Sequence, residues 1–182
     1  NIYQAHNVSI DIDHIPIDDA ETYKLFQEGR TVGVFQFESA GMRKYMKELK
    51  PTVMGDLIAM NALYRPGPMD NIDTYIKRKH GEVFNYLHPL LEPILKDTYG
   101  IIIYQEQIMR IAQVFAGYSL GEADVLRRAV SKKKKEVLDS EREKFVNHSV
   151  NNGYEAKVAN EIYDYIAKFA DYGFNRSHTV AY

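Results

Sequence analysis

The sequence predicts a mainly α-helical domain, an irregular assembly of about seven to nine short helices with little or no strand. Three observations support this prediction. Apolar residues recur at helical spacing in most segments, residues that favour helix N-termini precede several of these segments, and glycine or proline follows them. The hydrophobic fraction of 45% is sufficient for an ordinary globular core.

The first clear helix is expected over residues 19–28, and Gly29 ends it. In residues 31–37 apolar side chains alternate or follow one another, so we expect a short strand or an extended buried stretch there. Ser39 is expected to cap the next helix. Its apolar residues recur at i, i+3, i+4 and i+7, and Pro51 ends it.

A further helix is expected from about residue 52 to residue 63. The two prolines and the glycine of residues 65–68 forbid its continuation. Asp70 or Asn71 is in position to cap the helix that follows, which Gly81 closes.

Residues 82–98 are expected to form a loop with a short helix near residues 90–95. Residues 101–109 are apolar on several faces, which fits either a strand followed by a helix or a fully buried helix. The clearest helix start is Ser119 with Glu122 three positions later, a capping box whose helix is expected to run to about residue 130.

Three more helices complete the predicted domain. A polar helix is expected from about residue 134 to 150, and an amphipathic one from 155 to 170. Gly173 ends the amphipathic helix, and Asn175 or Ser177 opens the last one.

The composition excludes several kinds of protein. The chain has 182 residues, enough for one domain or two small ones, and no cysteine, so disulfides and thiolate metal sites are absent. No apolar run approaches the length of a membrane span, and no P-loop or serine-hydrolase elbow is present. Residues 1–10 mix polar and apolar types, so we expect no signal peptide there. The net charge of -2 means that any site for a polyanion must be a local patch.

Acidic and histidine residues give no metal site. The carboxylates of residues 11–13 and 18–19 lack a third convergent carboxylate, so we assign them to solvent or to helix caps. His80 and His88 are eight positions apart and have no third ligand at metal spacing.

A basic run is the first candidate site. Six of the nine residues from 127 to 135 are basic, namely Arg127, Arg128, Lys132, Lys133, Lys134 and Lys135, and none is acidic. Arginine suits bidentate contact with phosphate, whereas lysine acts as a point charge. The run alone fits either a solvated end of a helix hairpin or a phosphate-binding site.

The start of the last helix is the second candidate. Asn175, Arg176, Ser177 and His178 bring together cap groups, a guanidinium and an imidazole. Cations are unfavourable at the positive end of a helix dipole unless an anion binds there as well. The segment therefore fits either a phosphate cradle or a surface cap with an incidental histidine.

Two smaller features complete the candidates. A rigid turn after residue 63 can hold Tyr64 and Arg65 in fixed positions, although the spacing alone favours a plain helix-stop turn. Tyr104 and Gln105 begin a polar cluster that runs to residue 107, which could pair with a base, touch DNA or satisfy buried backbone. We favour the structural role for this cluster.

At these residues the sequence resembles the C-family replicative DNA polymerases, the alpha subunit of bacterial DNA polymerase III. The matching stretches occur in the family's order over about residues 16 to 182. They are residues 33–39 (GVFQFES), 62–68 (ALYRPGP), 78–81 (RKHG), 99–107 (YGIIIYQEQ), 117–124 (GYSLGEAD), 126–129 (LRRA), 172–175 (YGFN) and 177–178 (SH). The chain departs from the family's usual pattern at Ser131, Lys135 and Arg176, and these changes keep or raise the positive charge.

The resemblance implies that residues 1–18 are the tail of a preceding palm region or linker and that residues 19–182 are a fingers domain, truncated at its C-terminal end. The parent is then a DNA-directed DNA polymerase, a nucleotidyltransferase of the cytoplasm, whose palm aspartates hold two magnesium ions upstream of Asn1. No catalytic residue and no metal ligand is assigned within this chain, which is expected to be inactive alone.

The resemblance also implies the partners. They are primer–template DNA, the incoming deoxynucleoside triphosphate and other replisome subunits, with no membrane. Arg127, Arg128 and His178 match family residues on the nucleotide-facing side, and the four lysines are expected to reach DNA or phosphate. Two other interpretations stay open: a non-catalytic helical module that grips nucleic acid through its basic patch, and a purely structural interaction domain.

Overall fold

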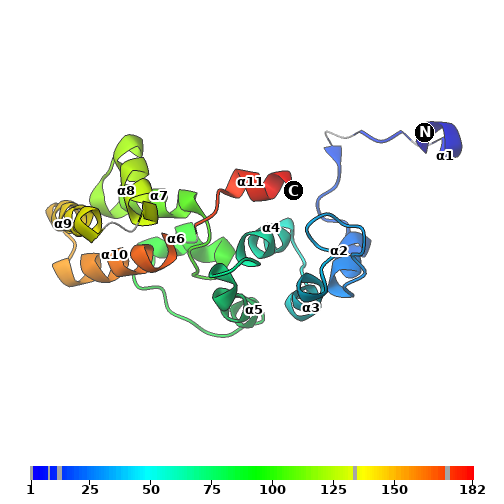
Figure 1. Cartoon of the computed structure of the whole chain (residues 1–182), viewed down its shortest axis with the longest axis horizontal. Coiled ribbons are helices and arrows are strands. Elements are labelled where there is room, and N and C mark those ends of the chain that lie inside the picture. Colours follow the sequence, from blue (N-terminus) through cyan, green and yellow to red (C-terminus); the bar gives the residue numbers. More distant parts are fainter. Residues whose placement is uncertain (1, 8, 12–13, 133–134, 171–172) are drawn as a thin grey trace. The chain divides into compact units, whose positions relative to one another are not determined.

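The computed structural model describes residues 2–7, 9–11, 14–132, 135–170 and 173–182, and every structural statement below refers to these residues. They form eleven α-helices and three short 3-10 helices (Figure 1). Within the described ranges there is no β-strand, only a single parallel bridge between Tyr104 and Phe174. The predicted mainly α class is therefore confirmed, with more helices than expected because short ones such as α1 (Ile2–His6) lack visible periodicity.

The chain divides into two compact units, residues 1–57 and 58–182, and each is described by itself. In the first unit, α2 (Ala20–Gln27) packs against α3 (Ala40–Leu49). Asp19 caps α2 by accepting a hydrogen bond from the Thr22 amide at 2.7 Å, and Ser39 caps α3 by accepting from the Met42 amide at 3.2 Å. Both predicted helices are confirmed.

Residues 31–37 correct the sequence prediction, because they form consecutive turns instead of a strand or an extended buried stretch. Gly33 and Gln36 have positive φ angles of 84° and 66°, which interrupt any extended run. Val32 is 72% exposed and Phe35 64% exposed, whereas Phe37 turns inward. Apolar residues here thus face both core and solvent, and their sequence pattern alone did not reveal the turns.

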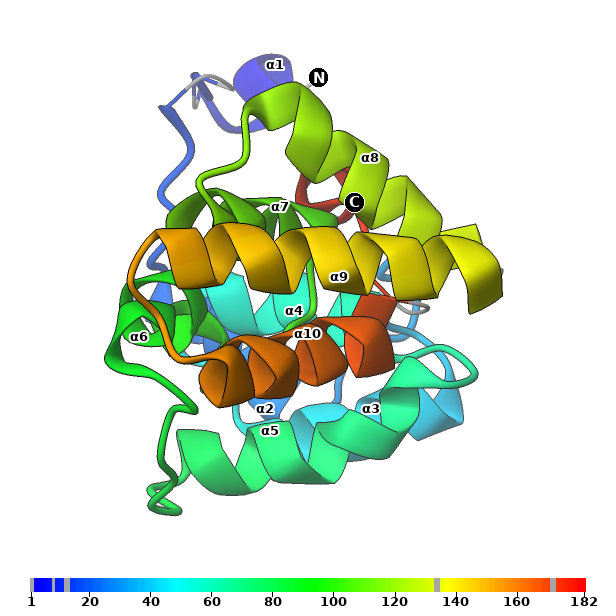
Figure 2. The same ribbon diagram turned by 90° about the vertical axis from the view of Figure 1, so that its left-hand side faces the viewer.

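The second unit begins within α4 (Met54–Leu63), which crosses the division between the units. Its remaining elements are η2 (Pro68–Asn71), α5 (Ile72–Lys79), η3 (Pro89–Leu91), α6 (Glu92–Leu95), η4 (Lys96–Thr98), α7 (Gln105–Ala116), α8 (Leu120–Lys132), α9 (Lys135–Asn151), α10 (Ala156–Ala170) and α11 (Arg176–Ala181). Helices α7 to α10 pack against one another, and Figure 2 shows α9 lying alongside α10. Their core includes Phe115, Leu126, Phe145 and Ile162, all 0% exposed.

Of two predicted helix caps in this unit, the structure confirms one and differs from the other. The capping box of α8 is confirmed: the Glu122 amide donates to Ser119 Oγ at 3.3 Å, and the Ser119 amide donates to Glu122 Oε2 at 3.0 Å. Asn71 precedes α5, but its side chain donates to the Pro68 carbonyl instead of capping the helix. The 3-10 turn η2 leads directly into α5, so a side-chain cap is replaced by backbone bonds.

Candidate phosphate-binding site

The start of α7 lies beside the segment that opens α11, although about 70 residues separate them in the sequence. The Gln105 amide donates to the Phe174 carbonyl at 2.9 Å, and the Phe174 amide donates to the Ile103 carbonyl at 3.0 Å. These two bonds make the parallel β-bridge between Tyr104 and Phe174. Residues 101–104 are therefore extended and α7 starts at Gln105, which excludes the fully buried helix considered for residues 101–109.

Arg127 on α8 joins this junction through one glutamine. Its Nη1 donates to Gln105 Oε1 at 3.2 Å, while Gln105 Nε2 donates to the Gly173 carbonyl at 3.0 Å. The Arg127 side chain is only 23% exposed. Two of the sequence candidates, the basic run and the segment before α11, thus meet in space through Gln105.

Asp124 binds both arginines of the pair. Its Oδ1 accepts from Arg127 Nε at 2.9 Å and from Nη2 at 2.7 Å, and its Oδ2 lies 2.8 Å from Arg128 Nη2. The hydrogen bond from Arg127 is the main reason that the pKa of the Asp124 carboxyl lies below its usual value. Asp124 is not among the site residues predicted from the sequence, although its spacing of three and four positions from the arginines is the helical ion-pair spacing that could have revealed it.

Arg65 reaches the same junction from the turn after α4. Its guanidinium carbon lies 3.8 Å from the centre of the Phe174 ring, and its Nε donates to the Ala62 carbonyl at 3.0 Å. Partial burial lowers the pKa of Arg65, which nevertheless stays protonated because arginine titrates far above neutral pH. Gly67, at φ 98°, gives the turn its backbone shape.

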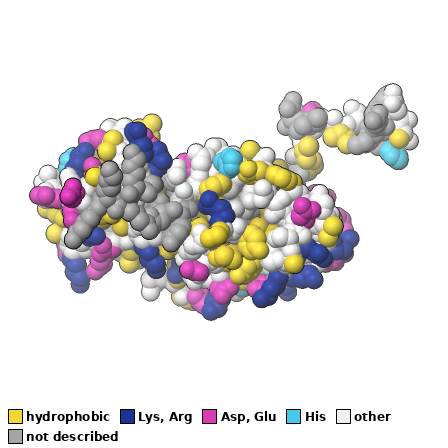
Figure 3. Space-filling view, viewed as in Figure 1, with side chains coloured by type: hydrophobic (Ala, Val, Ile, Leu, Met, Phe, Trp, Pro, Cys, Tyr) yellow, Lys and Arg dark blue, Asp and Glu magenta, His cyan; other side chains and the backbone are white. Residues whose placement is uncertain are grey.

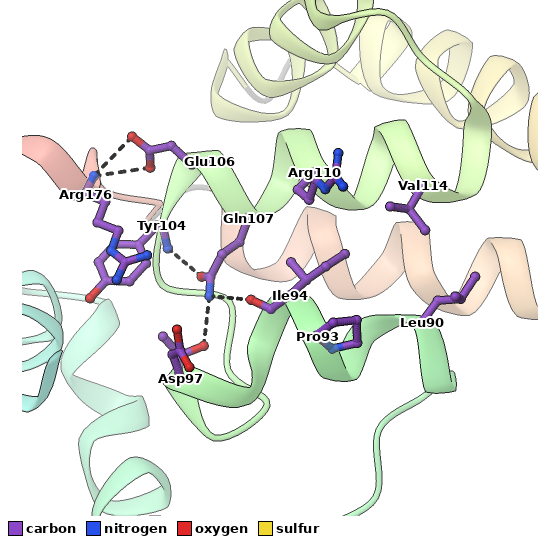
Figure 4. Close-up of a pocket in the computed structure, with 11 residues that line it drawn as sticks. Leu90, Pro93, Ile94, Asp97, Tyr104, Glu106, Gln107, Arg110, Val114 and Arg176 are labelled. Atoms are coloured by element: carbon purple, nitrogen blue, oxygen red, sulfur yellow. Dashed lines mark hydrogen bonds between the residues drawn. The ribbon is translucent and has the colours of Figure 1, made fainter.

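The first turn of α11 already has protein acceptors for two of its amides. Asn175 Oδ1 accepts from the His178 amide at 3.1 Å, so Asn175, not Ser177, caps the helix. The Arg176 amide lies 3.2 Å from both carboxylate oxygens of Glu106 (Figure 4). The expected cradle of open amides is therefore partly filled by a carboxylate from α7.

Most residues of α11 are exposed, and Thr179 is buried. Arg176 and His178 are both exposed. The His178 ring packs edge-on against the rings of Phe174 and Tyr182, with centroids 5.2 and 4.9 Å apart. Figure 3 shows a histidine and apolar side chains at the surface over α11. These positions remain accessible to a ligand, unlike Tyr104, which is 4% exposed and offers almost no surface to DNA.

A pocket of about 400 Å³ lies beneath the contact between Glu106 and Arg176 (Figure 4). Gln107, at its wall, accepts from the Ile103 and Tyr104 amides and donates to the Ile94 carbonyl and to Thr98 Oγ1. These bonds satisfy buried backbone, which is the structural role that we favoured for the polar cluster. Arg110 stands at the pocket's edge as a further exposed cation.

Lys133 and Lys134 lie outside the described residues, and the side chains of Lys132 and Lys135 lie outside the described part of the chain as well. Among the described residues, no group of three His, Asp or Glu side chains is arranged to hold a metal ion. None of the described helices is long and apolar enough to cross a membrane.

Comparison with known proteins places this helical chain in one family. A family model described as "Bacterial DNA polymerase III alpha subunit finger domain" matches residues 1–153. Over all 182 residues the chain is 57% identical to DNA polymerase III subunit alpha of Bacillus subtilis (strain 168) and 54% identical to that of Halalkalibacterium halodurans. The identity to the Staphylococcus aureus (strain Mu50) subunit is 54% over 176 residues, 96% of this chain.

The chain belongs to the family of bacterial DNA polymerase III alpha subunit finger domains. The resemblance drawn from its motifs is thereby confirmed. The chain spans 16% of the length of each of these three relatives. Residues 173–178 lie beyond the family model's match but inside the full-length alignment with the Bacillus relative.

Proposed function

We propose that this chain forms the fingers of a replicative DNA-directed DNA polymerase, where it contacts the incoming deoxynucleoside triphosphate and the nascent base pair. The observation that carries the proposal is the arrangement on α8: one carboxylate binds Arg127 and Arg128, and Arg127 is joined through Gln105 to the segment that opens α11. Guanidinium groups bind phosphate oxygens in the same forked geometry as carboxylates. Arg65, Arg176 and His178 add basic side chains around the same junction.

The proposed role of these residues is electrostatic. Arg127 and Arg128 neutralise the β- and γ-phosphates and orient the α-phosphate for in-line attack by the primer 3′-hydroxyl, after which pyrophosphate leaves. His178, with Asn175, Arg176 and Ser177, assists from α11. A charge-assisted hydrogen bond contributes about 1.5–3 kcal/mol, so losing one weakens use of the nucleotide by roughly ten- to a hundredfold.

The rest of the polymerase is assigned outside this chain. In this proposal residues 1–18 lead out of the palm or its linker and residues 19–182 form the fingers. The magnesium ions of the reaction are bound by palm carboxylates, and the residues described here contribute no metal ligands. Primer–template DNA and other replisome subunits are the macromolecular partners, in the cytoplasm, and Lys132 to Lys135 contact the DNA backbone with a salt-dependent contribution.

Primer extension by the full-length polymerase that contains this chain tests the proposal. The wild type is compared with the double variant Arg127→Ala/Arg128→Ala over a range of nucleotide concentrations at fixed salt. The matched control is Arg30→Ala, which removes an exposed arginine that pairs with Glu28 in the first unit. We expect a large fall in kcat/KM for the nucleotide in the double variant and none in the control.

Two further measurements decide what a negative result means. Primer–template binding and thermal stability are measured for each variant, because the proposal requires both to be retained. Unchanged nucleotide kinetics in the double variant would contradict the assignment. A loss of salt-dependent DNA binding with normal nucleotide kinetics would instead support the non-catalytic grip on nucleic acid.

A further inference from the structure

We propose that Gln105 is a positioning residue, which couples Arg127 on α8 to the segment that opens α11 and so holds the two halves of the triphosphate site in register. This inference rests on the proposed function, because it assigns Gln105 a role only through a ligand that Arg127 binds. It replaces the contact between Gln105 and DNA that the sequence left open.

Gln105 makes three hydrogen bonds across this junction. Its backbone amide donates to the Phe174 carbonyl at 2.9 Å, its Nε2 donates to the Gly173 carbonyl at 3.0 Å, and its Oε1 accepts from Arg127 at 3.2 Å. A side-chain amide is the group that can donate to a carbonyl and accept from a guanidinium at once. Neither glutamate nor lysine can make both side-chain bonds.

The close approach of Gln105 depends on the absence of a side chain at Gly173. A Cβ at that position would lie 3.3 Å from Gln105 Cγ and 3.4 Å from Ile108 Cδ1. The first distance is tighter than ordinary van der Waals contact, so a larger residue would require the glutamine side chain to shift by a few tenths of an ångström. The glycine therefore has a packing role at this position.

The orientation of Arg127 is fixed from two helices. Asp124 on α8 accepts from Nε and Nη2, and Gln105 on α7 accepts from Nη1. Because Gln105 is neutral, it adds orientation without cancelling the positive charge that a triphosphate needs. A second carboxylate beside Asp124 would leave the two-arginine group without net positive charge, since two acids would face two bases.

The test is a double-mutant cycle in the full-length polymerase, with nucleotide kcat/KM as the readout. Gln105→Ala is expected to lower kcat/KM about three- to tenfold, with the dissociation constant for primer–template unchanged. In the Arg127→Ala background the same change is expected to cost less than about twofold, because the group that Gln105 positions is gone. Gln113→Ala, which removes a glutamine farther along α7, is the control and leaves kcat/KM unchanged.

Gln105→Glu separates the bond to Arg127 from the bond to Gly173. It keeps the size of the side chain and the acceptor for Arg127, so a role limited to orienting Arg127 predicts kinetics close to wild type. The proposal predicts a loss of kcat/KM at least as large as that of Gln105→Ala, because the carboxylate repels the triphosphate and cannot donate to Gly173. Thermal melting of each variant confirms that the protein is folded.

The outcomes distinguish the inference from the function on which it rests. If Arg127→Ala lowers kcat/KM and Gln105→Ala does not, or if the two losses multiply independently, the positioning role is overturned while the proposed function survives. If Arg127→Ala itself leaves nucleotide kinetics unchanged, the proposed function fails first. Reduced coupling in the cycle together with a loss in Gln105→Glu supports the inference.

Discussion

Asp124 Oδ1 accepts hydrogen bonds from both Nε and Nη2 of Arg127, at 2.9 and 2.7 Å, while its second oxygen pairs with Arg128. A single carboxylate therefore organises the pair of arginines to which we assign the phosphates. Arg127 is 23% exposed and Arg128 58% exposed, so the carboxylate holds one arginine in a partly enclosed position and the other near solvent.

Asp124→Asn should lower kcat/KM for the nucleotide by about two- to fivefold. The change removes the charge that orients both guanidinium groups, but it also makes the site more positive. The second effect is the smaller one, because water and salt screen an exposed charge. Steady-state primer extension measures the outcome. An increase in kcat/KM would show instead that Asp124 competes with the triphosphate for the arginines.

Gly100→Ala should destabilise the chain by about 2–4 kcal/mol, the sum of backbone strain and overpacking. Gly100 has φ 78°, and a Cβ there would lie 2.5 Å from Phe84 Cε2 and 3.1 Å from Arg78 Nη1. Gly81→Ala is the matched control, since its φ is 101° and no atom lies within 4 Å of the added Cβ. Urea unfolding of the 182-residue chain should give the control about 1–2 kcal/mol of destabilisation; equal losses would argue against the clash.

Much of the fold could be predicted because the caps that start helices depend on residues only a few positions apart in the sequence. Ser39, Ser119 with Glu122, and Asn175 cap helices at the positions that their types and spacing indicate. Residues 31–37 were mispredicted because apolar alternation does not exclude turns, and Gln36 adopts a positive φ that glycine or asparagine usually occupies. In residues 31–37 the turns thus formed although the apolar pattern favours an extended conformation.

The candidate site was predicted in parts and not as an arrangement. Arg65, Arg127 and the residues at α11 were each selected by type, but no spacing rule relates them. The contacts that join them span 22 positions between Arg127 and Gln105, and 68 between Gln105 and Gly173. Such pairings depend on how helices pack, which one sequence does not specify. Asp124 could have been found, because its partners lie within one helical turn.

Glu122→Gln should make the folding stability of the chain depend less steeply on pH in the acidic range. The Ser119 amide, followed by Lys144 and the Ser119 hydroxyl, lowers the pKa of Glu122 from 4.5 to about 2. A depressed carboxyl pKa adds stability that is complete above the unfolded value and disappears as the pH falls through the folded value. The wild type should therefore lose this contribution between about pH 4.5 and pH 2.

Thermal melting between pH 7 and pH 2 checks this prediction. The glutamine variant should melt at a lower temperature than the wild type at pH 7, because it lacks the ion pair in which Lys144 Nζ lies 3.1 Å from Glu122 Oε1. The difference in melting temperature between the two proteins should become smaller as the pH falls from about 4.5 to 2. Glu28→Gln, which affects an ion pair but no capping box, serves as the control. Parallel curves for wild type and Glu122→Gln would refute the assignment.

Glu106→Ala should loosen the first turn of α11. The carboxylate of Glu106 accepts from the Arg176 amide, and a helix of six residues depends on such external acceptors because it makes few internal bonds. Amide hydrogen exchange should become faster in residues 176–181 and remain unchanged in α10. Asn175→Ala, which removes the bond from the His178 amide, should give the same local effect.

The same Glu106 variant also reports on the nucleotide site. Removing the carboxylate leaves the Arg176 amide available to a ligand and removes a negative charge beside Arg176 and His178. If a bound triphosphate restores the order of α11, the affinity for the triphosphate should therefore rise. The check is hydrogen exchange of the full-length polymerase with and without primer–template and nucleotide. Protection of residues 176–181 should return when nucleotide is added to Glu106→Ala. If exchange stays fast at saturating nucleotide, the start of α11 does not contact the phosphates.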